Sequence, residues 1–272
     1  MKLRQELLPV VLILIFLIVA REIYPYAGVM DAEIYDGYEQ ERIATGLGGP
    51  TCLVFDEEVL LVCDRDGGRI VTVDGDVVLS GLYYPHGMVL LDDGVVISEK
   101  GKLTRYDSNF ENPVVLIEGI PSGNHQTNAV NLLPNGTLIW HSGSTCNHCD
   151  EDDSRNAALL WVNATTGEHG ILASGVRNSF DGVWIDEIGY LFSDNGQDAE
   201  GSDFPDEEIN LLVEGGEYGW LEESKDDPNP AGTEAPVATW TPHTSVNGMT
   251  TRPANLPGNE YTVYATVYGS WA

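Results

Sequence analysis

The feature of this 272-residue sequence that most constrains its fold is a strand–turn–strand unit that recurs along the chain. In each unit a short apolar run rich in Val, Leu, Ile and Tyr is followed by an Asp, Asn or Gly turn and a second apolar run. Runs of this kind, bounded by turn residues, predict β-strands. Five units share the pattern, and they begin at Pro50, Pro85, Thr127, Asn178 and Ser245.

The spacing of the units indicates how the strands are arranged. The first two units begin 35 residues apart, and the later ones are further apart because loops are inserted. Further apolar runs, GRIVTVD, GKLTRYD and AALLWVN, follow the first three strand pairs as candidate third strands. A repeat of about 40–50 residues with several strands each is typical of a β-propeller, whose sheets surround a central channel. A stacked β-sandwich is the alternative, although it does not explain the repeated order.

The N-terminal 27 residues differ from the rest. Lys2 and Arg4 precede an uncharged apolar run of 14 residues, Leu7–Ala20, which predicts an apolar helix. This length is typical of a signal peptide and short for a membrane span, but no small-residue cleavage site follows. We therefore expect residues 1–27 to be a signal peptide or membrane anchor and residues 28–272 to be the propeller. Either choice predicts an extracytoplasmic protein, secreted or anchored to the membrane.

The four cysteines fit an exported protein. Cys52 and Cys63 flank a strand–turn–strand pattern, so a cross-strand disulfide is expected between them. Cys146 and Cys149 form the sequence CNHC, which taken alone also suits zinc or thiol redox chemistry. Because no second ligand pair follows, we favour a local disulfide that ties a loop.

The charge of the chain excludes one class of partner. With a formal net charge of −30, the protein is not expected to bind nucleic acid, since phosphate contacts need Lys and Arg. The segment Ser193–Trp220 holds nine carboxylates and no Lys or Arg. Asp, Glu and backbone carbonyls suit Ca²⁺, which takes six to eight oxygen ligands. A solvated acidic loop is the alternative, because no regular calcium-loop spacing is present.

Two of the predicted units begin with residues that can do chemistry. His125 lies just before the first strand of the third unit, where a propeller directs loop residues toward the channel mouth. It is a candidate general base, and an exposed loop histidine is the alternative. Arg177 and Asn178 stand at the equivalent junction of the fourth unit. The arginine can pair with a carboxylate of this acidic chain or hold an anionic ligand.

These segments, taken together and in this order, resemble the soluble quinoprotein glucose/sorbosone dehydrogenases, a family of six-bladed β-propellers. The resemblance is strongest from His125 to Trp220, and HTSVNGM and VYATVYGSW are similar to later family segments. Between those residues it rests on NLLPNGTLIWHSGSTCNHC, ALLWVNATTG, GVRNSFDGVWIDEIGYLFSDNG and PDEEINLLVEGGEYGW. It implies an all-β, six-bladed type of propeller, of which about five blades are present here.

The resemblance also implies an activity and a set of site residues. Family members bind pyrroloquinoline quinone (PQQ) over a Ca²⁺ and oxidise an aldose, or a related aldehyde or hydroxyl substrate, by hydride transfer to the quinone. The electron acceptor that follows the quinone is not indicated. Carried over residue by residue, the base would be His125, Arg177 would lie beside the quinone, and Asn178 would help to hold it. Carbonyl oxygens of Gly196 and Gln197 would bind the catalytic Ca²⁺, and Glu207, Glu208 and Tyr218 would support further calcium binding.

The chain also departs from the family pattern. It ends in the fifth unit, where relatives continue into another blade that carries further basic groups, so we expect an incomplete propeller that lacks part of the family's cofactor site. Gln197 replaces a proline found at that turn in some members. Two other functions stay open. One is a non-catalytic propeller that binds a protein partner or a glycan. The other is a gluconolactonase-like, metal-dependent hydrolase that would use Asn128, Asn178 and Asp194.

Overall fold

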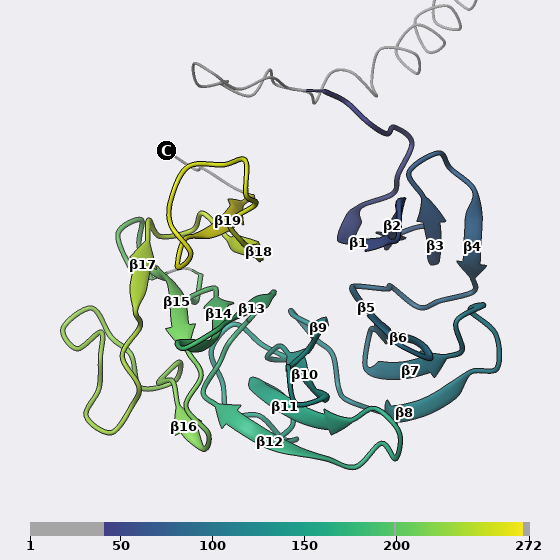
Figure 1. The fold of residues 1–272 in the computed structure, drawn as a ribbon. Helices are drawn as coiled ribbons and strands as arrows, with labels where there is room; N and C mark the ends of the chain where they lie inside the picture. Colours follow the sequence, from purple (N-terminus) through teal and green to yellow (C-terminus); the bar gives the residue numbers. More distant parts are fainter. Residues whose placement is uncertain (1–40, 199, 269–272) are drawn as a thin grey trace, which may run out of the picture. The chain divides into compact units, whose positions relative to one another are not determined.

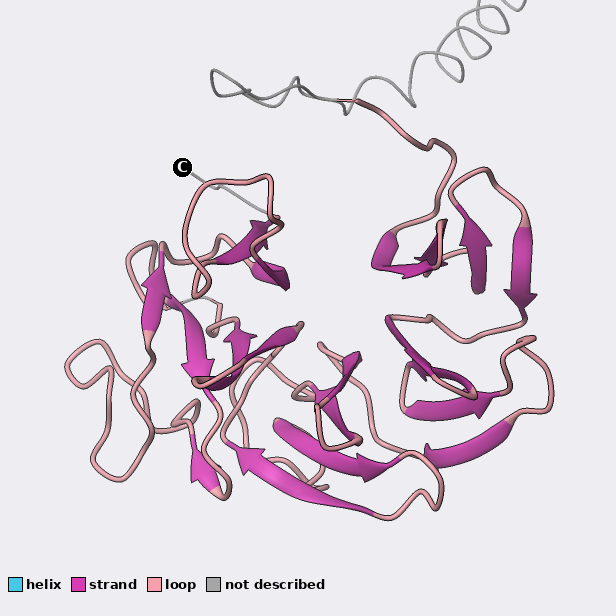
Figure 2. Ribbon diagram, in the orientation of Figure 1, coloured by secondary structure: helices cyan, strands magenta, loops and turns pink. Residues whose placement is uncertain are grey.

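The regular secondary structure of the described part is built from β-strands in successive antiparallel sheets (Figures 1 and 2). The computed structural model describes residues 41–198 and 200–268, and Ala44–Ala272 form one compact unit. The first sheet contains β1 (Pro50–Asp56), β2 (Val59–Asp64), β3 (Arg69–Thr72) and β4 (Val77–Ser80); the second contains β5 (Gly87–Leu91), β6 (Gly94–Glu99), β7 (Lys102–Tyr106) and β8 (Val114–Glu118).

The later sheets follow the same plan with additions. The third contains β9 (Thr127–Leu132), β10 (Thr137–Ser142), β11 (Ala158–Asn163) and β12 (His169–Ser174), with β16 (Gly216–Glu217) added in parallel to β12. The fourth contains β13 (Gly182–Ile185), β14 (Gly189–Asp194), β15 (Glu207–Leu211) and β17 (Ala238–Trp240). Within the described residues the fifth has two strands, β18 (Val246–Thr251) and β19 (Val263–Val267).

Local sequence explains how the strand pairs are joined. In the first sheet Asp56 pairs with Val59, so Glu57 and Glu58 form a two-residue hairpin turn. In the second sheet Leu91 pairs with Gly94, which leaves Asp92 and Asp93 as the turn. Two-residue hairpins favour turns with positive φ, and Glu57 has a φ of 51°. The acidic residues of these turns account for part of the negative charge without any binding role.

The first strands of successive sheets pack against one another, β1 against β5, β5 against β9, β9 against β13 and β13 against β18. Apolar side chains fill the space between neighbouring sheets. Between the second and third sheets, Val96 and Leu103 pack in one buried cluster with Leu138, Trp140 and Leu160. This repetition is the arrangement of a β-propeller, in which each sheet is one blade.

The predicted all-β propeller is confirmed in its described part. The five units form five sheets in chain order, and β3, β7 and β11 are the predicted third strands. Both predicted disulfides, Cys52–Cys63 and Cys146–Cys149, are present. The apolar N-terminal helix predicted within residues 1–27 lies outside the described residues. In the described part of the chain, no helix has the length and hydropathy required to span a membrane.

Replacing Trp140 with alanine is expected to lower the free energy of unfolding by about 3–5 kcal/mol, the range for large-to-small changes in a core. Trp140 is fully buried, and its Nε1 donates to Ser98 Oγ at 2.8 Å, so the change opens a cavity and leaves that hydroxyl unpaired. Urea denaturation measures the loss. The matched control is Trp161→Ala on the same sheet, because Trp161 is 36% exposed. Equal losses in the two variants would contradict this account of the core.

Candidate functional site

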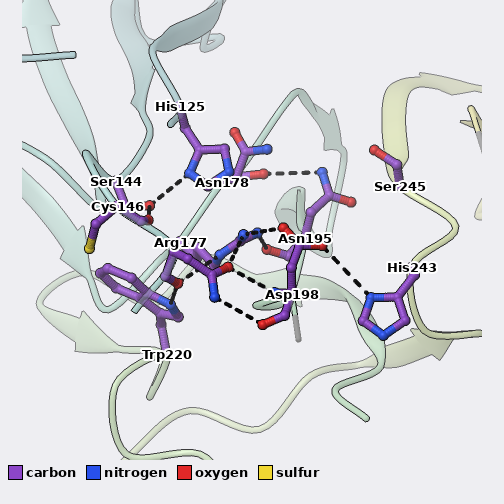
Figure 3. Close-up of polar contacts among 12 residues, drawn as sticks. His125, Ser144, Cys146, Arg177, Asn178, Asn195, Asp198, Trp220, His243 and Ser245 are labelled. Carbon is purple, nitrogen blue, oxygen red and sulfur yellow. Dashed lines mark hydrogen bonds and ion pairs between the residues drawn. The ribbon is translucent and has the colours of Figure 1, made fainter. Parts of the chain in front are cut away.

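Four loops from the third and fourth sheets bring the candidate residues together (Figure 3). His125 lies just before β9, and Arg177 and Asn178 lie between β12 and β13. The loop 144–147 follows β10, and the turn 195–198 follows β14. Each residue therefore stands in a loop that begins or ends at a paired strand.

The hydrogen bonds of His125 determine which ring nitrogen carries the proton. Ser144 Oγ donates its single hydrogen to the carbonyl oxygen of Cys146 at 2.8 Å. The same Oγ lies 2.8 Å from His125 Nδ1, so it accepts a hydrogen from that nitrogen. Burial, and then the positive charge of Arg177, lower the pKa of His125 to about 4. The imidazole is consequently neutral at pH 7, with an unprotonated Nε2 that can accept a proton.

The guanidinium of Arg177 is buried and almost fully engaged. Its Nε donates to the Asn147 carbonyl oxygen at 3.1 Å, and one nitrogen donates to the Asn195 carbonyl oxygen at 2.9 Å. The other terminal nitrogen bonds Asn147 Oδ1 at 2.7 Å and Asp198 Oδ2 at 3.1 Å. Because a guanidinium has five N–H donors, one remains for a ligand. Burial lowers the pKa of Arg177 from its ordinary value, and the group still remains charged at neutral pH.

Asn147 is the residue that the sequence did not single out and that holds these loops together. Its carbonyl oxygen also accepts from Trp220 Nε1 at 3.2 Å, and its side chain both accepts from the Asp198 amide and donates to the Asp198 carbonyl. Asn147 stands between Cys146 and Cys149, whose disulfide closes the loop. Since the disulfide uses both sulfur atoms, the zinc and free-thiol interpretations of CNHC do not apply to this structure.

A carboxylate fixes the backbone on which Arg177 and Asn178 stand. Asp194 Oδ2 accepts from the Arg177 amide at 2.9 Å, and Oδ1 accepts from the Asn178 amide at 2.7 Å. Burial raises the pKa of Asp194 to about 8. The chain bends at Arg177, between β12 and β13. Arg177 accordingly lines one cavity and Asn178 lines another.

The cavity on the Asn178 side, called the mouth cavity here, has a volume of about 260 Å³. Its lining consists of Arg65, Tyr84, His86, Lys100, Gly123, Asn124, His125, Gln126, Asn128, Asn178 and Phe180. Asn178 Oδ1 accepts from Asn128 Nδ2 at 3.0 Å, which orients both amides. The general-base candidate and one cofactor-side candidate therefore share a wall.

The cavity on the Arg177 side, called the acidic cavity here, is very small, at about 10 Å³. This is about the space of one water-sized sphere, and so of one ion. Its lining consists of Arg177, Asp194, Gly196, Gln197, Asp206, Glu208, Trp220 and Glu223. Burial raises the pKa of Glu208 to about 7. Burial, followed by the negative charges of Glu208 and Asp194, raises the pKa of Glu223 to about 9.

The structure thus groups some predicted metal residues and separates others. Gly196, Gln197 and Glu208 meet at the acidic cavity. Glu207 lies beneath the turn, where its two oxygens accept from the Gly196 amide at 2.9 Å and the Ser245 amide at 3.0 Å. The Tyr218 side chain is in the core, with its hydroxyl donating to the Leu211 carbonyl oxygen and its ring against Phe192.

The donor set of the acidic cavity fits a hard divalent cation. Within the described residues, Asp194, Glu208 and Glu223 form no ion pair with a Lys or Arg. Gln197 Oε1 is buried without a hydrogen-bond partner. Carboxylate and amide oxygens are the ligands that Ca²⁺ takes, and these side chains line one cavity. Asp194 and Glu223 lay outside the sequence prediction because their contribution depends on how the turn and the segment after Trp220 fold together.

Comparisons with known proteins identify the fold of this chain but not its family. No family model matches the chain. An uncharacterized protein of Borreliella burgdorferi is 37% identical over 101 residues. That match covers 35% of this chain and 26% of the relative, about a quarter of its length.

Solved structures are similar over most of the chain. The PQQ-bound aldose sugar dehydrogenase of Streptomyces coelicolor has a TM-score of 0.66 and 22% identity, over 84% of this chain and 76% of that one. A calcium structure of a Trichoderma reesei enzyme of carbohydrate-active family AA12 has a TM-score of 0.72 and 18% identity, over 88% of this chain and 78% of that one. The structural similarity to PQQ-dependent sugar dehydrogenase propellers is therefore shown, and at these identities it shows the fold alone.

Calcium is expected to raise the melting temperature by about 5–10 °C at a concentration one hundred times its dissociation constant, because binding to the folded state alone adds about 2.7 kcal/mol. Differential scanning fluorimetry in matched Ca²⁺ and Mg²⁺ titrations measures the shift. Glu223→Gln should remove most of it, since the variant loses one carboxylate of the acidic cavity. Glu222→Gln is the control, because that neighbouring side chain is exposed. An equal calcium response in both variants would count against the site.

Proposed function

We propose that this chain forms the cofactor- and substrate-binding face of a PQQ- and calcium-dependent dehydrogenase that oxidises an aldose, or a related aldehyde or hydroxyl substrate. The observation that carries the proposal is the state of His125, a neutral imidazole whose Nδ1 is tied to Ser144 while Nε2 is unprotonated at the mouth cavity. The fold shared with PQQ-bound sugar dehydrogenases supports this assignment.

The residues that line the two cavities have different roles in the proposed reaction. In the proposed reaction His125 Nε2 accepts the proton of a substrate hydroxyl, which makes the oxygen a better electron donor to its own carbon. Asn128 and Asn178 offer amide groups that orient the sugar hydroxyls or the cofactor. When bound, the quinone supplies the acceptor for the hydride and its two electrons.

The acidic cavity would hold the Ca²⁺ of this site. Gly196 and Gln197 are the proposed carbonyl ligands, while Glu208 and Glu223 supply negative charge beside them. Arg177 lies on the same wall with one free N–H donor, placed to bind an anionic oxygen. Because Asn147, Asn195 and Asp198 hold this guanidinium, its orientation is fixed before any ligand arrives. Export by the N-terminal segment stays a prediction.

Replacing His125 with alanine is expected to abolish turnover, at least a 100-fold loss in kcat, and to leave quinone affinity nearly unchanged. The chain, reconstituted with PQQ and Ca²⁺, is assayed by dye reduction on aldoses, and quinone affinity is measured by fluorescence titration. His169→Ala is the control, since that histidine is exposed on an outer strand. If His125→Ala keeps near-wild-type turnover, His125 is not the base.

The pH profile of kcat/KM tests the same residue independently. Because His125 has a pKa of about 4, the base is unprotonated above about pH 5, and the profile should be flat from there to neutrality. Below about pH 4 the rate should fall about tenfold per pH unit as the imidazole takes up a proton. An acid limb centred near pH 6.5, the ordinary value for histidine, would show that the base is not buried as described.

A further inference from the structure

The mouth cavity has a charge opposite to that of the chain as a whole. The sequence contains 43 Asp and Glu against 13 Lys and Arg. The lining of the mouth cavity nevertheless contains Arg65 and Lys100 and no carboxylate. In a protein this acidic, a cavity whose only charged lining residues are cations favours an anion, although Asp66, outside the lining, pairs with Arg65.

Lys100 is the cation that is held in place without a partner. Among the described residues it forms no salt bridge, whereas Arg65 pairs through Nε with Asp66 at 2.8 Å. Its ammonium lies 5.8 Å from the centre of the Tyr84 ring, a cation–π contact. Tyr84 has a φ of 52°, an uncommon conformation for a non-glycine residue. The Lys100 backbone amide donates to the Tyr83 carbonyl oxygen at 2.9 Å, which ties the two segments together.

The rest of the lining suits hydroxyl groups. His86 is 5% exposed, its ring lies 4.7 Å from the Phe180 ring, and its Nδ1 has no hydrogen-bond partner. Burial, and then the charge of Arg65, lower the pKa of His86 to about 3, so this imidazole is neutral. Asn128, Asn178 and the unprotonated Nε2 of His125 complete a set of neutral polar groups.

The volume of the mouth cavity and the residues that line the acidic cavity narrow the choice of ligand. At about 260 Å³ the mouth cavity lies below the range of about 300–1,000 Å³ for drug-sized ligands and suits one monosaccharide. Two sources could bring a carboxylate to it, a sugar acid or the quinone, which is itself anionic. Of the proposed cofactor residues, Arg177 lines the acidic cavity, which has room for one ion, and Asn178 lines the mouth cavity. His125, the proposed base, also lines the mouth cavity, and a base must meet the substrate, so we assign the carboxylate there to a sugar acid.

We propose that the mouth cavity binds a monosaccharide that carries a carboxylate, a hexuronic acid. The carboxylate lies against Lys100 and Arg65, and the anomeric hydroxyl lies toward His125. The assignment of the reacting end rests on the proposed function. The recognition of the carboxylate stands on the cavity alone.

Isothermal titration calorimetry of the chain with D-glucuronate and with D-glucose, without quinone, tests the inference. Glucuronate should bind at least tenfold more tightly than glucose, because a hydrogen bond to a charged group contributes about 1.5–3 kcal/mol. Lys100→Met should weaken glucuronate binding about tenfold and leave glucose binding unchanged. Lys225→Met is the control, since Lys225 is an exposed lysine paired with Asp203. Added salt should weaken the binding of glucuronate alone.

Three outcomes would overturn the inference. They are equal affinity for the two sugars, glucuronate affinity unchanged in Lys100→Met, and a Lys100→Met variant that loses only quinone affinity, which would assign the cation to the cofactor. If Lys100→Met fails to fold, the inference is tested by the glucuronate affinity of Lys100→Gln and by the affinities of the wild-type chain for the two sugars. A chain that binds glucuronate through Lys100 but reduces no dye would refute the proposed oxidation and still support the carboxylate site.

Discussion

The close contact between β5 and β9 at Gly87 is the constraint on which the rest of the site depends. A Cβ at this position would lie 2.7 Å from Ala129 Cα and 2.8 Å from Val130 N, so a side chain there would push the two strands apart. His86 precedes Gly87, and Asn128 precedes Ala129, so the contact brings both to the wall of the mouth cavity. The packing that joins two blades therefore also builds the cavity.

The two cavities on either side of Arg177 and Asn178 are lined by charged groups of different sign. Arg177 and Asn178 are adjacent, and Asp194 holds both of their backbone amides. On the Arg177 side, carboxyl groups outnumber the cation, and burial raises the pKa values of Glu208 and Glu223, so a bound cation would favour their charged form. On the Asn178 side, cations stand without carboxylates. A divalent cation and an anionic ligand would each complete one side, and the two would lie on either side of the same short segment.

The sequence predicted the parts of the molecule that depend on local pattern. Strand alternation and turn residues were sufficient for the five units and for the third strands of the first three, because each sheet is built largely from neighbours in the chain. His125, Arg177 and Asn178 were found because they stand in the loops that lead into the first strands of their units. Asn147, Lys100 and Glu223 were not found, since their roles come from contacts between loops of different sheets. The hydrogen bonds of Arg177 to the backbone carbonyls of Asn147 and Asn195, beside its ion pair with Asp198, are equally invisible in a sequence.

The loop closed by Cys146 and Cys149 contacts residues that orient a side chain in each of the two cavities. Its Cys146 carbonyl takes the hydrogen of Ser144, and that bond fixes the proton on Nδ1 of His125. Its Asn147 holds the guanidinium of Arg177 from two directions. A flexible loop would have to be ordered each time a ligand binds, at a cost in conformational entropy. A disulfide three residues apart removes much of that freedom beforehand. The base on one side and the cation on the other are thus oriented by one short segment, which explains why an otherwise unremarkable loop carries a cross-link.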